Sequence, residues 1–186
     1  SSAASDVYKR QRANYPSFQV GIEHHTCQER CSLANFALMA NSTALPGGYS
    51  FIREIGRGAF ARIYEGRTAD GHPVAIKMLL SPSSMSRKRF MREAKVLRAL
   101  PPNRHIVGYI DSGTTDDDTP FLVLELLDGI TLATVLGTGR RFAEPAAAAL
   151  LTQLCDAFTE LHKLGVTHGD IKPTNIMLTA GTGSGR

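Results

Sequence analysis

The alternation of apolar and polar residues from residue 49 onward predicts a series of short β-strands. Strands are expected at residues 49–55, 63–66, 73–79, 106–111 and 121–125. These segments are rich in β-branched and aromatic residues and are separated by turn residues, as in antiparallel sheets. A glycine-rich turn with Gly56 and Gly58 separates the first two strands. The hairpin dipeptide Asp70-Gly71 precedes the third strand.

Three other segments favour helix, and one more favours a short strand. Helices are expected at residues 87–100, 131–136 and 144–164, and the strand at residues 176–178. Serines before the first helix are candidate N-caps, and Pro145 suits the first turn of the long helix. The apolar stripes predicted by helical spacing are Phe90, Ala94 and Leu97 in the first helix, and Ala147, Leu151, Leu154, Phe158 and Leu161 in the long one.

Residues 1–48 show no sustained periodicity and are expected to form an irregular extension, with at most a short helix at residues 33–40. Side chains that could bind zinc occur between His24 and Cys31. No second ligand pair follows at the spacing of a zinc finger, so a plain polar segment is favoured.

The composition is that of an ordinary globular protein. The chain has 186 residues, of which 42% are hydrophobic and 20% charged, and a net charge of +4. No window approaches a membrane-spanning run of about 18 apolar residues, so no membrane association is expected. Three cysteines, an odd and small number, favour a reducing compartment, and we therefore expect a cytoplasmic location.

Basic residues gather on one side of the helix expected at residues 87–100. They are Arg87, Lys88, Arg92, Lys95 and Arg98. No aromatic residues interleave these charges, so we interpret them as a solvated face and expect no nucleic-acid partner.

The strongest candidate for chemistry is the polar segment at residues 168–175. It places Asp170, Lys172 and Asn175 close together, and Pro173 prevents a regular helix there. A second candidate is Lys77, the one charged residue in its apolar strand, which requires a charged partner or a functional reason.

From residue 49 onward, the order of these motifs resembles that of a eukaryotic-type protein kinase domain. Residues 56–63 resemble the glycine-rich loop, with Ala61 where the third glycine usually stands. The Val-Ala-Ile-Lys run at residues 74–77 resembles the lysine motif, and residues 121–129 resemble the fifth strand and hinge. Residues 168–175 match the pattern H-x-D-x-K-x-x-N, and the lysine followed by proline resembles the serine/threonine-directed form.

This resemblance implies an α+β, protein-kinase-like fold at residues 49–186. The N-lobe, residues 49–127, would be a five-stranded antiparallel sheet with one helix. The C-lobe, residues 128–186, would be mainly helical and truncated.

The resemblance also implies an ATP site. Its residues would be Ile55, Gly56, Gly58, Ile63, Ala75, Lys77, Glu93, Leu124, Glu125, Leu127 and Met177. Lys77 would contact phosphates and pair with Glu93. The hinge would offer backbone groups of Glu125 and Leu127 to adenine, with Leu124 as gatekeeper.

The same resemblance assigns the catalytic residues. Asp170 would accept or orient the proton of a protein Ser/Thr hydroxyl, and Lys172 would stabilise charge on the transferred phosphoryl group. Asn175 would bind Mg²⁺.

Two features depart from the family pattern. Gly169 replaces the arginine that usually precedes the catalytic aspartate. In this respect the chain resembles kinases that are not switched by a phosphorylated activation loop. The His-Gly-Asp triplet also resembles small-molecule phosphotransferases, which usually carry a histidine at the position of Lys172. The glycine-rich loop, the lysine motif and the hinge favour the protein-kinase family.

The chain also ends before an Asp-Phe-Gly motif. We therefore expect an incomplete and poorly active portion of a kinase, because that aspartate holds magnesium against the phosphates. The alternatives are a kinase-like nucleotide-binding module without transfer and a small-molecule phosphotransferase. An uncovered apolar side of the helix at residues 144–164 would be available to a partner.

Overall fold

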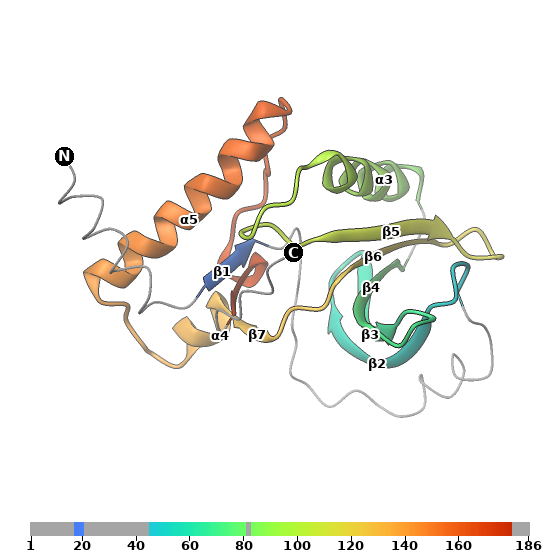
Figure 1. Cartoon of the computed structure of the whole chain (residues 1–186), viewed down its shortest axis with the longest axis horizontal. Helices are drawn as coiled ribbons and strands as arrows, with labels where there is room; N and C mark the ends of the chain where they lie inside the picture. Colours follow the sequence, from blue (N-terminus) through green and yellow to red (C-terminus); the bar gives the residue numbers. More distant parts are fainter. Residues whose placement is uncertain (1–16, 21–44, 81–82, 180–186) are drawn as a thin grey trace.

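The five expected strands form one antiparallel sheet. The computed structural model describes residues 17–20, 45–80 and 83–179. Across the sheet the order is β2-β3-β4-β6-β5, and every neighbouring pair is antiparallel (Figure 1). The strands are β2 (Ser50–Arg57), β3 (Ala61–Arg67), β4 (Pro73–Leu79), β5 (Tyr109–Thr114) and β6 (Pro120–Glu125). The predicted five-stranded lobe is confirmed.

Strand β5 begins later than the sequence predicts. The expected strand at residues 106–111 includes Ile106 and Val107. Both residues are buried in the core, but they precede β5 and are not part of that strand. Burial against the helix and sheet requires the same apolar side chains as strand pairing, so the pattern could not place this boundary.

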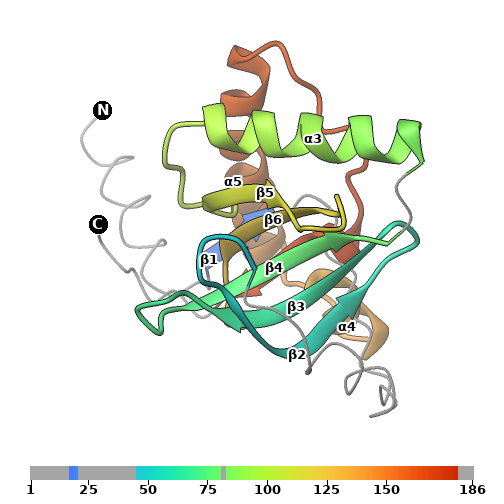
Figure 2. The ribbon, with the colours of Figure 1, turned by 90° about the vertical axis from the view of Figure 1, so that its right-hand side faces the viewer.

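Helix α3 (Ser84–Ala99) lies across one face of the sheet (Figure 2). The hydroxyl of Ser83 accepts a hydrogen bond from the backbone N–H of Ser86, which caps the start of the helix. The predicted stripe of Phe90, Ala94 and Leu97 is buried against the sheet, as expected.

The start of α3 is also attached to the turn between β5 and β6. The Arg87 guanidinium donates to both carboxylate oxygens of Asp118, at 2.9 and 2.8 Å, and to its backbone carbonyl at 2.8 Å. This bidentate contact links the first turn of the helix to the turn at the sheet edge.

The second lobe contains two helices and a small sheet. Helix α4 (Leu132–Gly137) begins at a Thr131 cap, and α5 (Glu144–Lys163) has proline in its first turn. Strands β7 (Gly129–Thr131) and β8 (Ile176–Thr179) pair antiparallel, and the 3₁₀ turn η1 (Pro173–Asn175) leads into β8.

The buried stripe of α5 differs in part from the predicted one. Its buried residues are Leu150, Leu154, Ala157 and Leu161. Leu151, predicted to be buried, is 61% exposed. Both sets repeat every three or four residues, so helical spacing allowed either, and packing against the core decides which side of the helix is buried. None of the described helices is long and apolar enough to cross a membrane.

Part of the N-terminal segment is strand, which the sequence interpretation missed. Residues Ser17–Val20 form β1, which pairs antiparallel with β8, from Ser17 opposite Thr179 to Val20 opposite Ile176. The expectation that residues 1–48 are irregular throughout is therefore wrong for these four residues. Four residues are too few to show a period, and it is the edge of β8 that gives them partners. The helix expected at residues 33–40 and the zinc-binding candidates lie outside the described residues.

Proline substitutions in β1 test this pairing. In the Phe18→Pro/Gln19→Pro double variant we expect faster amide hydrogen exchange in β8. One of two adjacent strand residues directs its N–H toward β8, and proline has none to donate. The measurement is hydrogen–deuterium exchange of residues 176–179, with the amides of β6 as the internal reference. Unchanged β8 exchange would show that β1 does not protect it.

Candidate active site

One cavity lies between the first strands of the sheet and the segment that connects the lobes. Its volume is about 380 Å³. The predicted ATP-site residues that line it are Ile55, Gly56, Ile63, Ala75, Glu125, Leu127 and Met177. The remaining lining residues are Arg53, Glu65, Leu126, Asp128 and Gly129. Apolar walls with a few polar groups are typical of a site for a planar organic ligand.

The connecting segment is held rigidly at Glu125. The backbone N–H of Glu125 donates to the carbonyl of Gly108 at 2.9 Å, and its carboxylate accepts the N–H of Gly108 at 2.8 Å. Leu127 lies two residues beyond the end of β6. Its backbone groups therefore stand outside the sheet ladder, at the wall of the cavity.

Two of the predicted ATP-site residues, Leu124 and Gly58, line neither this cavity nor the larger one described below. Leu124 is fully buried and pairs across the sheet with Ala75, so it lies in the core. Gly58 lies in the turn between β2 and β3, where its N–H donates to the carbonyl of Ala61 at 2.8 Å. That amide is therefore used by the turn itself.

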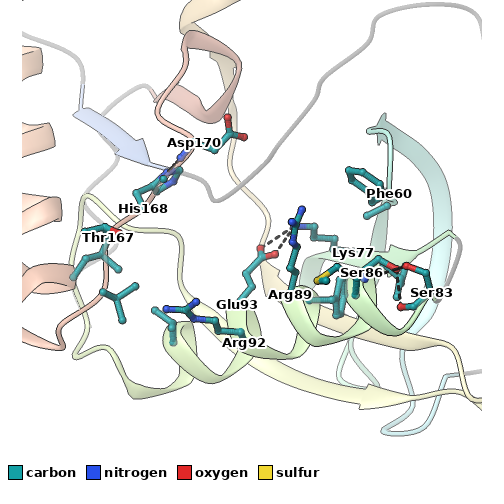
Figure 3. A pocket seen from close by; sticks show the side chains of 18 residues that line it. Phe60, Lys77, Ser83, Ser86, Arg89, Arg92, Glu93, Thr167, His168 and Asp170 are labelled. Carbon is teal, nitrogen blue, oxygen red and sulfur yellow. Dashed lines mark hydrogen bonds and ion pairs between the residues drawn. The ribbon is translucent and has the colours of Figure 1, made fainter.

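A second and larger cavity lies between α3, β4 and the segment before Asp170 (Figure 3). Its volume is about 610 Å³, and it brings together the predicted residues Lys77, Glu93 and Asp170 from three separate parts of the chain. Its other lining residues are Phe60, Ala61, Leu79, Ser83, Met85, Ser86, Arg89, Phe90, Arg92, Val96, Leu161, Val166, Thr167, His168 and Gly169.

The centre of this cavity is a buried ion pair. Lys77 is 2% exposed and its Nζ donates to both carboxylate oxygens of Glu93, each at 2.8 Å. The Phe90 ring centroid lies 5.8 Å from the same nitrogen, within the range of a cation–π contact. A buried ammonium requires such compensation, because removing it from water is costly. The sequence expectation that Lys77 pairs with Glu93 agrees with this geometry.

The segment leading to Asp170 is shaped by a glycine and a histidine. Gly169 has φ +76°, a left-handed conformation that other residues adopt only with strain. His168 accepts the N–H of Asp170 at its Nδ1, at 3.2 Å, and its ring packs edge-on against Phe158, with centroids 6.1 Å apart. These contacts fit a scaffold role for His168 in this segment.

Asp170 is held by the two other predicted catalytic residues. The ammonium of Lys172 lies 2.7 Å from its Oδ2. The Nδ2 group of the fully buried Asn175 donates to the Asp170 carbonyl at 2.9 Å and to Oδ2 at 3.2 Å. The hydrogen bond from Lys172 is the main cause that lowers the pKa of Asp170, and Asn175 adds to it. The carboxylate is therefore ionised at neutral pH and able to accept a proton or a cation.

These residues also fit a magnesium ion. Asp170 and the amide oxygen of Asn175 are oxygen donors of the kind that Mg²⁺ prefers, and they would hold such an ion. No group of three or more His, Cys, Asp or Glu side chains suited to a metal was found in the described part of the chain. This donor set suits an ion that takes most of its ligands from phosphates and water.

A family model described as the protein kinase domain matches residues 49–184. The chain belongs to the protein kinase family.

Named relatives and a solved structure agree with this membership. The kinase chain is 33% identical over 142 residues to serine/threonine-protein kinase Pkn1 of Myxococcus xanthus, covering 74% of this chain and 20% of the relative. It is 30% identical over 140 residues to CDPK-related kinase 3 of Arabidopsis thaliana, covering 71% and 23%. The crystal structure of the M. tuberculosis PknI kinase domain matches with a TM-score of 0.63 and 25% identity, over 74% of this chain and 56% of that one. The chain spans about a fifth of the length of these two curated relatives.

Sequence reasoning missed part of the lining of both cavities. Arg92 was assigned to a solvated face and Arg89 to no role, yet both line the larger cavity. Asp128 lines the smaller one. The sequence offered one signal for two of them, which is that they adjoin predicted site residues: Arg92 precedes Glu93, and Asp128 follows Leu127.

Removing Glu93 tests the buried pair of this kinase chain. We expect Glu93→Ala to lower the free energy of unfolding by about 3 kcal/mol, because it leaves the Lys77 ammonium buried and unpaired. Urea unfolding measures this change. Glu160→Ala is the control, since Glu160 pairs with the 64%-exposed Lys163 and should cost less than about 1 kcal/mol. Equal losses in the two variants would contradict the role of the buried pair.

Removing Lys172 tests the control of Asp170. Since Lys172 lowers the pKa of Asp170, Lys172→Ala should raise that pKa toward the ordinary value. A carboxyl group whose pKa is lower in the folded than in the unfolded protein stabilises the fold at any pH above the unfolded-state pKa. This stabilisation is lost as the pH falls through the folded-state pKa. In the variant this acid-side loss should become smaller. Titration of the Asp170 carboxyl carbon by NMR measures the shift, with Lys163→Ala as the control, and an unchanged Asp170 pKa in Lys172→Ala would refute the assignment.

Proposed function

We propose that this kinase chain carries the ATP-binding and proton-accepting groups for transfer of the γ-phosphate to Ser/Thr hydroxyls of proteins. The observation that supports this most directly is that the Lys77–Glu93 pair and Asp170 line one cavity. A phosphate-binding cation and an ionised carboxylate are thereby presented to the same space. Phosphoryl transfer depends mainly on such positioning and on charge stabilisation.

Each group has a distinct task in this proposal. The smaller cavity would hold the adenine, with the backbone of Leu127 at its edge and Met177 and Ala75 at its apolar walls. Lys77, kept in place by Glu93, would contact the phosphates. Asn175 would be a ligand of Mg²⁺, and the charge of that ion would offset the negative charge of the phosphates.

Asp170 would accept or orient the proton of the acceptor hydroxyl. Its lowered pKa keeps it ionised at neutral pH, as a proton acceptor must be. Lys172, now paired with Asp170, would exchange that contact for the transferred phosphoryl group. Cytoplasmic location belongs to the same proposal and is supported by cysteine usage alone.

A second candidate function is nucleotide binding without transfer. It is favoured by the small number of metal ligands in the described residues, where Asp170 and Asn175 are the candidates. Transfer and binding without transfer share the adenine cavity and the Lys77–Glu93 pair, so only an assay of the product separates them.

Binding and transfer can be measured on the same preparations. We expect MgATP to raise the melting temperature of the 186-residue chain, and Lys77→Met to remove this shift because the phosphate-binding cation is lost. Lys95→Met, on the exposed side of α3, is the matched control and should keep the shift. A wild-type chain that shows no shift with MgATP would exclude both candidate functions.

Transfer is then followed with radiolabelled ATP and a mixture of Ser/Thr peptides. We expect Asp170→Asn to retain the ATP-dependent melting shift and to lose phosphopeptide formation. ATP binding with no phosphopeptide from the wild-type chain would favour the binding module. Label transferred to amino-alcohols instead of peptides would favour a small-molecule phosphotransferase.

A further inference from the structure

The side chain of Glu125 continues the pairing of two strands beyond the end of their ladder. In the β5–β6 pair the first matched residues are Tyr109 and Leu124. One step further, the backbone N–H of Glu125 donates to the Gly108 carbonyl at 2.9 Å. The returning bond, from the Gly108 N–H at 2.8 Å, is accepted by the Glu125 carboxylate and not by a backbone carbonyl. A side chain therefore closes the last pair of bonds between these two segments.

The carboxylate lies directly against the backbone of Gly108. A Cβ atom at this position would be 3.2 Å from the carboxyl carbon of Glu125 and 3.4 and 3.5 Å from its two oxygens. Since 3.2 Å is shorter than an ordinary contact between carbon atoms, a larger residue would displace the carboxylate. Gly108 directly follows Ile106 and Val107, which are buried in the core. The glutamate is thus attached to a closely packed part of the sheet lobe.

This contact lies where strand β6 leads into the wall of the smaller cavity. β6 ends at Glu125, and Leu126 and Leu127 follow it along that wall. On its other side Glu125 is paired with Val74 of β4, so its backbone is held between two neighbours. A shift of Glu125 would move the backbone groups that border the cavity. Hydrogen bonds weaken steeply when donor and acceptor lose their alignment, so such a shift would be felt by a ligand there.

We propose that the Glu125 side chain is a positioning residue for the adenine ring. By accepting the Gly108 N–H, it sets the position of the Glu125 carbonyl and of the Leu127 backbone against the edge of the ring. This role rests on the proposed function, which places adenine in the smaller cavity. Preference for adenine over other purines then depends on a side chain that need not touch the nucleotide. Binding sites require positions accurate to about 0.5 Å, and supporting contacts of this kind provide them.

A direct contact between the Glu125 carboxylate and the nucleotide is the competing interpretation, because Glu125 also lines the cavity. The geometry favours the positioning role, since one carboxylate oxygen already accepts the Gly108 N–H at 2.8 Å. A substitution at Gly108 separates the two interpretations. It disturbs a positioning contact but leaves a direct contact with the nucleotide in place.

The test compares two magnesium nucleotides, ATP and purine riboside triphosphate, on the 186-residue chain. Both have the ribose and the three phosphates, but the second lacks the 6-amino group that would donate to the Glu125 carbonyl. Isothermal titration calorimetry of the wild-type chain should show tighter binding of ATP. Glu125→Ala should reduce this preference by about threefold to tenfold, the effect of one hydrogen bond. Loss of folded protein alone would weaken the binding of both nucleotides equally and leave their ratio unchanged.

Two further variants keep the test independent of the stability of Glu125→Ala. Glu125→Gln retains an oxygen that accepts the Gly108 N–H and should keep the preference within about twofold. Gly108→Ala displaces the carboxylate and should reduce the preference as Glu125→Ala does. In the double variant the second substitution should add little to the first, because both act on one contact.

Asp111→Ala is the matched control. Asp111 lies on β5, and its carboxylate also accepts a backbone N–H, that of Ser112, at 2.8 Å. Asp111 lines neither of the two described cavities. The variant therefore removes the same kind of bond from the same strand, and it should keep the wild-type preference for ATP.

The outcomes distinguish the role of Glu125 from the proposed function. An unchanged preference in Glu125→Ala, or an equal loss in Asp111→Ala, would overturn the role of Glu125. A loss in Glu125→Ala without one in Gly108→Ala would overturn it in favour of direct contact. Equal binding of both nucleotides by a wild-type chain that retains the MgATP melting shift would overturn the adenine preference alone. Binding of neither nucleotide by the wild-type chain would overturn the proposed function and, with it, the role of Glu125.

Discussion

The ion pair between Lys77 and Glu93 is the interaction on which the rest of the site depends. It joins the middle of the sheet to helix α3 through two hydrogen bonds of 2.8 Å, in a place where Lys77 is almost completely shielded from water. A buried ammonium is tolerated only while its partner remains in place. The apolar stripe of α3, its serine cap and the contact of Arg87 with Asp118 therefore all serve to keep Glu93 within reach.

The segment that carries Asp170 is held in place by Asn175. This residue is fully buried, and its amide group holds both the backbone and the carboxylate of Asp170. The strand that follows it, β8, is enclosed by β7 on one side and β1 on the other. Gly129 permits the close approach of β7, because a Cβ at this position would lie 2.4 Å from the carbonyl oxygen of Leu178. Asp170 therefore lies in a segment that is held by Asn175 and by the pairing of β8 with both β7 and β1.

Helix α3 has two roles that come from the geometry of a single turn. Its inward side places Glu93 against Lys77, and the adjoining positions place Arg89 and Arg92 at the rim of the same cavity. One element thereby supplies both the carboxylate that holds Lys77 and two arginines that line the cavity beside Asp170. The position of α3 sets both features together, so a shift of the helix would disturb them jointly.

The sequence by itself determined the five strands, the two longer helices and the motif residues Lys77, Glu93, Asp170 and Asn175. Local periodicity and spacing carry that information, because strand and helix periods repeat within a few residues. The tertiary structure alone decided the pairing of β1 with β8, the burial of Leu150 in place of Leu151, and the late start of β5. It also decided that Leu124 packs in the core and that Arg89 and Arg92 face the active-site cavity. These outcomes depend on which surfaces meet across long separations in the chain, and no local pattern encodes that contact.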